Sequence, residues 1–181
     1  MNRHRQLDTL FLDRDGVINV QLVGDYVKRV EELELREDFL MAIPLLRAAF
    51  RRFIVVTNQQ CIAKGLCTRA DVDTVHAHLR EQLSAHGLML DAIYVCPHLA
   101  GAGCHCRKPE PGMMEQALTD FPDIDRARSL MVGDSASDMR FGRNAGLPTL
   151  FIGKVTDDNR AEIAACADIV SPSLLQFAQT L

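Results

Sequence analysis

The sequence lacks any long apolar segment, and it also lacks a cluster of basic residues. No stretch of its 181 residues is apolar over the length that a bilayer-spanning helix needs. Residues 1–8 lack the apolar stretch of a secretory signal peptide. The formal charge is −4, and the lysines and arginines are scattered along the chain. These absences argue against a membrane or nucleic-acid partner and predict a cytoplasmic protein that acts on a small molecule.

Internal repeats and low-complexity segments are missing as well. The length suits a single domain over residues 1–181, and a hydrophobic content of 48% is enough to bury a sizeable core. Short apolar runs alternate with helical patterns along the chain, which is typical of an α/β fold. We therefore expect a Rossmann-like three-layer sandwich around a central parallel sheet.

The expected strands are short and mostly apolar, as strands buried on both faces of a sheet should be. They cover residues 9–12, 53–57, 92–96, 129–132 and 149–152, with a last strand or turn near 168–170. Helical patterns fit residues 37–52, 68–86, 111–121 and 135–144, and a short helix is expected near the C-terminus. The segments after the first and third strands are too short for a large cap domain. A site at the carboxyl ends of the strands should therefore be open.

Two carboxylates end the first apolar run, Asp13 and Asp15, and Gly16 follows them. Because side chains alternate along an extended chain, both carboxylates should point to one spot. Like charges at that distance repel, so such a pair favours a bound cation or a protonated carboxyl group. A polar turn after a buried strand would explain the pair if it stood alone.

Three further polar segments lie at the ends of later apolar runs or on a loop before a helix. Their candidate phosphate-binding or metal-binding residues are Thr57, Asn58, Arg107, Lys108 and Asp134, and Asp138 follows Asp134 one helical turn later. Hydroxyl, amide and ammonium groups can bind phosphate oxygens, although each segment alone is also typical of a turn, a surface or a helix cap. Ligands of parallel sheets bind at the carboxyl ends of the strands, where all of these segments are expected.

Three cysteines and a histidine crowd into one short segment, Cys96, His98, Cys104 and Cys106. In a reducing compartment such a cluster favours metal binding over disulfides, and four such ligands suit a closed, structural zinc site. The spacing of one residue within each pair is tighter than usual. His105 alternates with the two cysteines and should point away. The metal would hold the following Arg-Lys pair in place.

The motifs occur in the order Asp-x-Asp, Thr, Lys and Gly-Asp-x-x-x-Asp over about residues 8–152, an order that resembles the haloacid dehalogenase superfamily of phosphohydrolases. The resemblance implies that Asp13 is a nucleophile that forms an aspartyl-phosphate and that Asp15 is the general acid and base. Thr57 and Lys108 would hold the transferring phosphoryl oxygens. Mg²⁺ would be bound by Asp13, Asp134 and the backbone carbonyl of Asp15.

The cysteine-rich loop and the Arg-Lys-Pro sequence at 107–109 narrow the resemblance to the group that contains heptose-bisphosphate and histidinol-phosphate phosphatases. The segments 24–27, 63–65 and 111–113 look more like the heptose enzymes, which supply heptose for lipopolysaccharide or surface glycans. The short cysteine loop also occurs in the histidinol-phosphate group, so both substrates remain open. A third hypothesis is a zinc-stapled binding module with a vestigial site, against which the intact set of carboxylates argues.

The resemblance also suggests how a substrate would be recognised. Adjacent residues of an extended segment point to opposite sides, so Arg107 should reach away from the scissile phosphate toward a second anion, while Asn58 would contact the substrate. Two positions depart from the pattern, Cys61 in place of a usual glycine and Ser135 in place of a lysine found in some heptose phosphatases. We expect a monomer that binds a small phosphorylated substrate.

Overall fold

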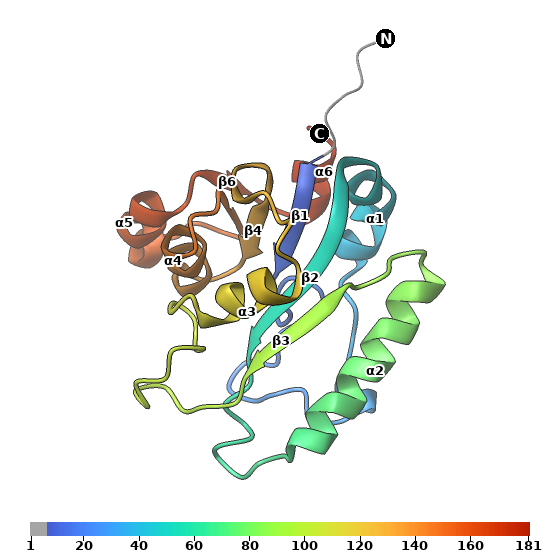
Figure 1. Cartoon of the computed structure of the whole chain (residues 1–181), viewed down its shortest axis with the longest axis vertical. Coiled ribbons are helices and arrows are strands. Elements are labelled where there is room, and N and C mark those ends of the chain that lie inside the picture. The colour runs from blue at the N-terminus through green and yellow to red at the C-terminus, as the bar shows by residue number, and fades with distance from the viewer. Residues whose placement is uncertain (1–6) are drawn as a thin grey trace.

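A parallel sheet of six strands forms the centre of the protein (Figure 1). The computed structural model describes residues 7–181, so residues 1–6, which belong to the segment without a signal-peptide pattern, lie outside it. The strand order is β3-β2-β1-β4-β5-β6, and every neighbouring pair is parallel. The strands are β1 (Leu7–Leu12), β2 (Phe50–Asn58), β3 (Ala92–Cys96), β4 (Leu130–Gly133), β5 (Thr149–Ile152) and β6 (Ile169–Ser171).

Helices cover both faces of the sheet, which confirms the three-layer α/β prediction. They are α1 (Glu37–Ala49), α2 (Arg69–Ala85), α3 (Gly112–Asp120), α4 (Ala136–Asn144), α5 (Asp157–Cys166) and α6 (Leu174–Ala178). On β1, Leu10 and Leu12 join a core cluster with α1, α2 and α6. Phe11 points to the other face and packs with α3 and α4. This alternation follows from the two-residue period of a strand.

Two differences from the sequence prediction go beyond small shifts at the ends of elements. The helix expected over 37–52 ends at Ala49, because Phe50 already pairs with Leu7 of β1 and is almost fully buried as the start of β2. Helix α5 was not expected. Only Ile163 and Cys166 of α5 are buried, so its apolar pattern is too sparse to indicate an amphipathic helix.

No large cap domain covers the sheet within residues 7–181. Between β1 and α1 the chain forms only a 3₁₀ turn, Val30–Glu32, and isolated bridges at Asn19. In the same described range, none of the helices is both long and apolar enough to cross a bilayer.

The strand order places β1 and β4 side by side in the middle of the sheet. After β1 the chain builds β2 and β3 on one side, and it then returns to add β4, β5 and β6 on the other side. The carboxyl ends of β1 and β4 are therefore neighbours at the point where the strand order reverses. In open α/β sheets this is where ligands bind.

Two adjacent leucines of α1 provide a test of this packing. Leu46 is fully buried in the core, whereas Leu45 is 40% exposed. Leu46→Ala should lower the free energy of unfolding by about 2–5 kcal/mol, because it leaves a cavity in the core. Leu45→Ala should change it by less than about 0.5 kcal/mol. Denaturant unfolding followed by circular dichroism measures both, and similar losses for the two variants would contradict this orientation of α1.

Candidate active site

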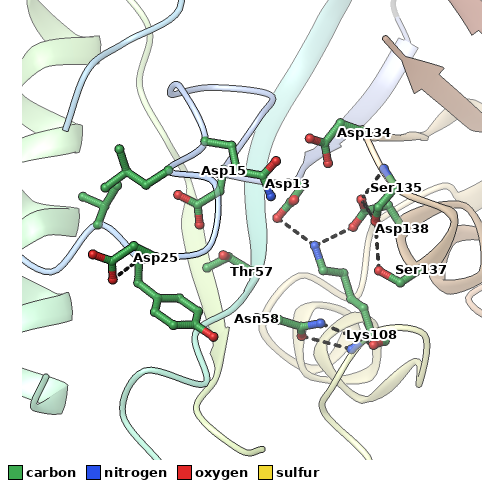
Figure 2. A pocket seen from close by; sticks show the side chains of 14 residues that line it. Asp13, Asp15, Asp25, Thr57, Asn58, Lys108, Asp134, Ser135, Ser137 and Asp138 are labelled. Atoms are coloured by element: carbon green, nitrogen blue, oxygen red, sulfur yellow. Dashed lines mark hydrogen bonds and ion pairs between the residues drawn. The ribbon is translucent and has the colours of Figure 1, made fainter. Parts of the chain in front are cut away.

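A pocket opens at the carboxyl ends of β1, β2 and β4 (Figure 2). The polar residues brought there from four separate sequence segments include Asp13, Asp15, Thr57, Asn58, Lys108, Asp134 and Asp138. The structure thus gathers all but one of the sequence-predicted catalytic and substrate-binding residues. The exception is Arg107, which is described below.

Lys108 lies between two carboxylates in this pocket (Figure 2). Its Nζ is 2.7 Å from Oδ1 of Asp13 and 2.6 Å from Oδ1 of Asp138, and it donates a hydrogen bond of 2.9 Å to the Val56 carbonyl. The Lys108 side chain is only 2% exposed. Burial alone would lower the pKa of Lys108, but the charges of Asp13 and Asp138 outweigh burial and raise it. These contacts therefore favour the charged form of Lys108 in the pocket.

Asn58 holds the backbone of Lys108 in place. Its Oδ1 accepts a hydrogen bond from the Lys108 N–H at 3.1 Å, and its Nδ2 donates to the Lys108 carbonyl at 3.3 Å (Figure 2). Asn58 was predicted to bind substrate, and it does line the pocket. Both polar atoms of its amide nevertheless form hydrogen bonds with the backbone of Lys108.

Three carboxylates, Asp13, Asp134 and Asp138, offer oxygen atoms within 4.8 Å of one another. Burial, with repulsion from Asp138 and Asp134, raises the pKa of Asp13 to about 8 although Lys108 opposes this. Burial and Asp138 raise the pKa of Asp134 to about 6. A single lysine thus leaves excess negative charge among hard oxygen donors, which fits a divalent cation such as Mg²⁺.

Gly16 permits the close approach of Asp134 in this cluster. A Cβ atom at this position would lie 1.9 Å from Oδ2 of Asp134, and the φ angle of Gly16 is +85°. Both observations require glycine here. The turn after β1 is therefore shaped to bring its carboxylates against the end of β4.

Asp15 differs from the sequence expectation. Its carboxylate is bound by Arg14 NH2 at 2.9 Å to each oxygen, by Asn19 Nδ2 at 3.0 Å and by Gln59 Nε2 at 2.8 Å. Burial opposes its ionisation, but the Arg14 charge and these hydrogen bonds lower the pKa of Asp15. The expected mutual repulsion of Asp13 and Asp15 is therefore weak, because Arg14 neutralises Asp15. Among the influences on Asp13, the charge of Asp15 is the smallest.

The cysteine loop brings its four predicted ligands together. Sγ of Cys96 lies 3.7 Å from Nδ1 of His98 and 3.7 Å from Sγ of Cys104. Sγ of Cys106 lies 3.1 Å from Cys96 Sγ, 3.8 Å from Cys104 Sγ and 3.1 Å from His98 Nδ1. Ligands of a tetrahedral zinc are separated by about 3.8 Å, from a Zn–S bond of about 2.3 Å. The geometry is thus consistent with a zinc loop, and His105 turns away to Glu115 as expected.

Arg107 lies on the same loop, outside the pocket of Asp13. Its NH1 donates to the His98 carbonyl at 3.2 Å. It lines a second hollow, formed mostly by residues 99–104 and 107–110, and Lys108 borders both hollows. The predicted divergence of Arg107 and Lys108 is therefore present in the structure.

The segment between residues 19 and 30 forms one wall of the pocket. Tyr26 lines it, and the Tyr26 hydroxyl accepts hydrogen bonds from Gln60 Nε2 at 2.8 Å and Lys64 Nζ at 2.9 Å. Oε1 of Gln60 also accepts the N–H of Ala100 at 3.2 Å. Gln60 thus links the wall to the cysteine loop.

Sequence reasoning assigned no role to several residues that contact the site. Asp138 was read as a possible helix cap; its Oδ2 does accept the Ser135 N–H at 3.1 Å, while Oδ1 pairs with Lys108. Gln59 donates to both Thr57 and Asp15. Arg14 and His76 were also missed, and no local pattern marks the pairing between them. For Gln59, the adjoining Thr-Asn pair was a usable signal.

Comparison with known proteins places these features in a family. Residues 105–177 match the family described as HAD-hydrolase-like. The chain is 40% identical over 169 residues to the D-glycero-alpha-D-manno-heptose-1,7-bisphosphate 7-phosphatase of Mycobacterium bovis, which covers 93% of this chain and 88% of that protein. It is 34% identical to the D-glycero-beta-D-manno-heptose-1,7-bisphosphate 7-phosphatase of Escherichia coli K12, over 98% of this chain and 95% of that protein.

A solved structure is similar over almost the whole chain. It is the D,D-heptose 1,7-bisphosphate phosphatase of B. bronchiseptica, complexed with magnesium and phosphate. Its TM-score is 0.82 and its sequence identity 31%, and the match covers 96% of this chain and 97% of that one.

His76, which lies beside the site on α2, allows a prediction about pH. Burial and the Arg14 charge lower the pKa of His76 to about 3, from 6.5 in an unfolded chain. Below pH 6.5 the unfolded chain therefore binds a proton that the folded chain does not, so stability falls as pH falls toward 3. Between pH 7 and pH 5 this contribution should cost about 2 kcal/mol.

The loss should be smaller in His76→Gln, which has no imidazole to titrate. Denaturant unfolding of both proteins at pH 7 and pH 5 measures the difference. An NMR titration of the histidine ring protons provides the direct check. A His76 ring that becomes protonated near pH 6.5 in the folded protein would contradict this prediction.

Proposed function

Because this chain belongs to the haloacid dehalogenase-like phosphatases, in the group of the heptose-1,7-bisphosphate 7-phosphatases, we propose that it hydrolyses the 7-phosphate of D-glycero-D-manno-heptose 1,7-bisphosphate. The observation that carries this proposal is the buried Lys108, held between Asp13 and Asp138 beside Asp134. An anionic nucleophile can attack an anionic phosphate only where cations reduce their repulsion. No feature of the site favours histidinol phosphate over the heptose, and both relatives quoted above are heptose phosphatases.

In the first step, an oxygen of Asp13 attacks the phosphorus atom, and the bond from phosphorus to the oxygen on carbon 7 breaks. Asp15 gives its proton to that oxygen, and the negative charge of the bound phosphoryl group favours the protonated form of Asp15 that this step requires. In the second step, Asp15 takes a proton from water, which attacks the aspartyl-phosphate and releases inorganic phosphate. Thr57 and Lys108 hold the phosphoryl oxygens throughout.

The carboxylates of Asp13 and Asp134, together with the backbone carbonyl of Asp15, would hold Mg²⁺, which supplies positive charge against the phosphoryl oxygens. The related structure was obtained with magnesium and phosphate. Asp138 also belongs to the carboxylate cluster, but both of its oxygens have partners: Oδ1 pairs with Lys108, and Oδ2 accepts hydrogen bonds from the backbone N–H and the hydroxyl of Ser135. We propose that Asp138 orients Lys108 between the cluster and the substrate.

We propose that the cluster of Cys96, His98, Cys104 and Cys106 holds a structural zinc. The loop leads directly into Arg107 and Lys108, so a metal there would fix the positions of two cations. None of the six cysteines forms a disulfide bond. Free thiols are typical of a reducing compartment, which supports a cytoplasmic location.

The nucleophile can be tested by substitution and trapping. Wild-type protein with Mg²⁺ should release phosphate from heptose 1,7-bisphosphate faster than from histidinol phosphate, measured as kcat/KM for both anomers of the heptose. Asp13→Asn should reduce turnover by at least about a thousandfold and leave the melting temperature near that of wild type, because it removes the attacking anion and little volume. A metal-fluoride complex should attach to Asp13 in a crystal structure. A phosphoryl mimic on another side chain would contradict the assignment.

Metal analysis tests the zinc proposal. Protein purified without chelator should contain about one zinc per chain. Cys104→Ser should lose that zinc and much of the activity, whereas Cys166→Ser, on α5 far from the loop in sequence, should retain both. If Mg²⁺ alone restored full activity to zinc-free protein, zinc would not be needed to hold Arg107 and Lys108 in position.

Arg107 should distinguish a bisphosphate from a monophosphate. Arg107→Ala should lower kcat/KM for the heptose bisphosphate, because a charge-assisted hydrogen bond to the second phosphate is lost. The loss should correspond to about 1.5–3 kcal/mol of transition-state stabilisation. The loss on a simple monophosphate should be much smaller. Equal losses on both substrates would mean that Arg107 serves the chemistry and not the recognition of the second phosphate.

A further inference from the structure

Arg14 is a completely buried arginine for which the proposed reaction has no direct use. Its exposed fraction is 0%, although it lies between Asp13 and Asp15 in the chain. A buried cation is costly unless it is paired and hydrogen-bonded. Nε and NH2 of Arg14 contact the Asp15 carboxylate at 3.3 and 2.9 Å, and NH1 contacts His76 Nε2 at 3.0 Å. Each of its three guanidinium nitrogens thus has a partner.

His76 accepts the hydrogen bond from Arg14. Its low pKa keeps the imidazole neutral, so Nε2 can act as the acceptor for the NH1 donor. The ring is only 6% exposed and comes from α2, whose Val75 and Leu79 are buried in the core. The position of the ring is therefore set by helix packing, independently of the loops that line the pocket.

The guanidinium in turn sets the plane of the Asp15 carboxylate. NH2 bridges both carboxylate oxygens at 2.9 Å, while Asn19 binds Oδ1 and Gln59 binds Oδ2. If His76 could not accept a hydrogen bond, NH1 of Arg14 would be a buried donor without this partner. The guanidinium would then gain by rotating toward another acceptor, and rotation would break its two-oxygen contact with Asp15.

We propose that His76 and Arg14 are positioning residues for Asp15, so that a residue of α2 sets the orientation of the group that protonates the leaving oxygen. This inference rests on the proposed function, in which Asp15 is the general acid. It assigns His76 a role through Arg14, and neither residue touches the phosphoryl group. The competing explanation is that His76 only fills the core. Substrates with different leaving groups distinguish the two explanations, because only a positioning role predicts a loss that depends on the leaving group.

The test compares substrates that differ in their need for a proton. The sugar alkoxide of the heptose bisphosphate is a poor leaving group and must be protonated, whereas the phenolate of p-nitrophenyl phosphate leaves without this help. The ratio of kcat/KM on these two substrates reports the first chemical step only, and a general loss of folded protein cancels from it. Three variants are compared with wild type: His76→Leu, His76→Gln and His78→Leu.

In His76→Leu, the ratio of kcat/KM on the heptose bisphosphate to kcat/KM on p-nitrophenyl phosphate should fall at least about tenfold. A general acid usually contributes more than this, and a misaligned Asp15 should lose part of that contribution. His76→Gln should recover part of this loss, because its amide oxygen can accept from Arg14. His78→Leu is the matched control and should leave the ratio within about twofold of wild type. His78 lies on the same helix, is partly exposed, and bonds to Gln82. If His76→Leu does not fold, His76→Met replaces it, since its thioether fills the space but accepts only weakly.

Several outcomes would overturn the positioning role while leaving the proposed function intact. These are a ratio in His76→Leu that stays within tenfold of wild type, an equal loss on both substrates, or a Gln variant as impaired as the Leu variant. Wild-type protein that hydrolyses neither substrate would overturn the proposed function itself, and the positioning role with it.

Discussion

The buried ion pairs of Lys108 are the interaction on which the rest of the site depends. Three carboxylates converge at one edge of the sheet: Asp13 just after β1, Asp134 just after β4 and Asp138 in the first turn of α4. Burial raises the pKa of Asp13 and Asp134. Lys108 comes from a distant loop and contacts two of the three. Without a cation such a cluster would protonate and lose its nucleophile. Lys108 opposes the rise in the pKa of Asp13 but does not cancel it. An ionised Asp13 in this buried position therefore needs a second cation, and a divalent metal would supply it.

The placement of Lys108 has two separate supports. Asn58, at the end of β2, binds both the N–H and the carbonyl of its backbone. The cysteine cluster brings the preceding loop against the end of β3, since Cys96 ends β3, Cys106 lies two residues before Lys108, and their Sγ atoms are 3.1 Å apart. A long side chain loses considerable rotamer freedom when it is held in one position. Because its backbone is held by Asn58, the side chain of Lys108 carries most of the remaining cost, which the two ion pairs can offset.

The two aspartates of the Asp-x-Asp motif are separated by one residue but have opposite electrostatic environments. Asp13 faces carboxylates and its pKa is raised, whereas Asp15 faces Arg14, Asn19 and Gln59 and its pKa is lowered. Without metal and substrate, these directions are the reverse of what the proposed roles require, so a cation beside Asp13 has to favour its ionised form and the phosphoryl charge has to favour the protonated form of Asp15. No large cap covers the pocket within residues 7–181, so we expect the Tyr26 wall and the cysteine loop to recognise the rest of the substrate.

The sequence by itself determined the α/β class, the order of the phosphatase motifs and the clustering of three cysteines and a histidine in the cysteine loop. These features depend on local periodicity and short spacings, which a sequence displays directly. Only the tertiary structure decided that Asn58 binds the Lys108 backbone, 50 residues away, and that His76 meets Arg14 across 62 residues. It also decided that Asp15 is neutralised by its own neighbour and that Asp138 pairs with Lys108. Such pairings depend on side-chain direction and on which helix packs over which strand, and no local spacing encodes either.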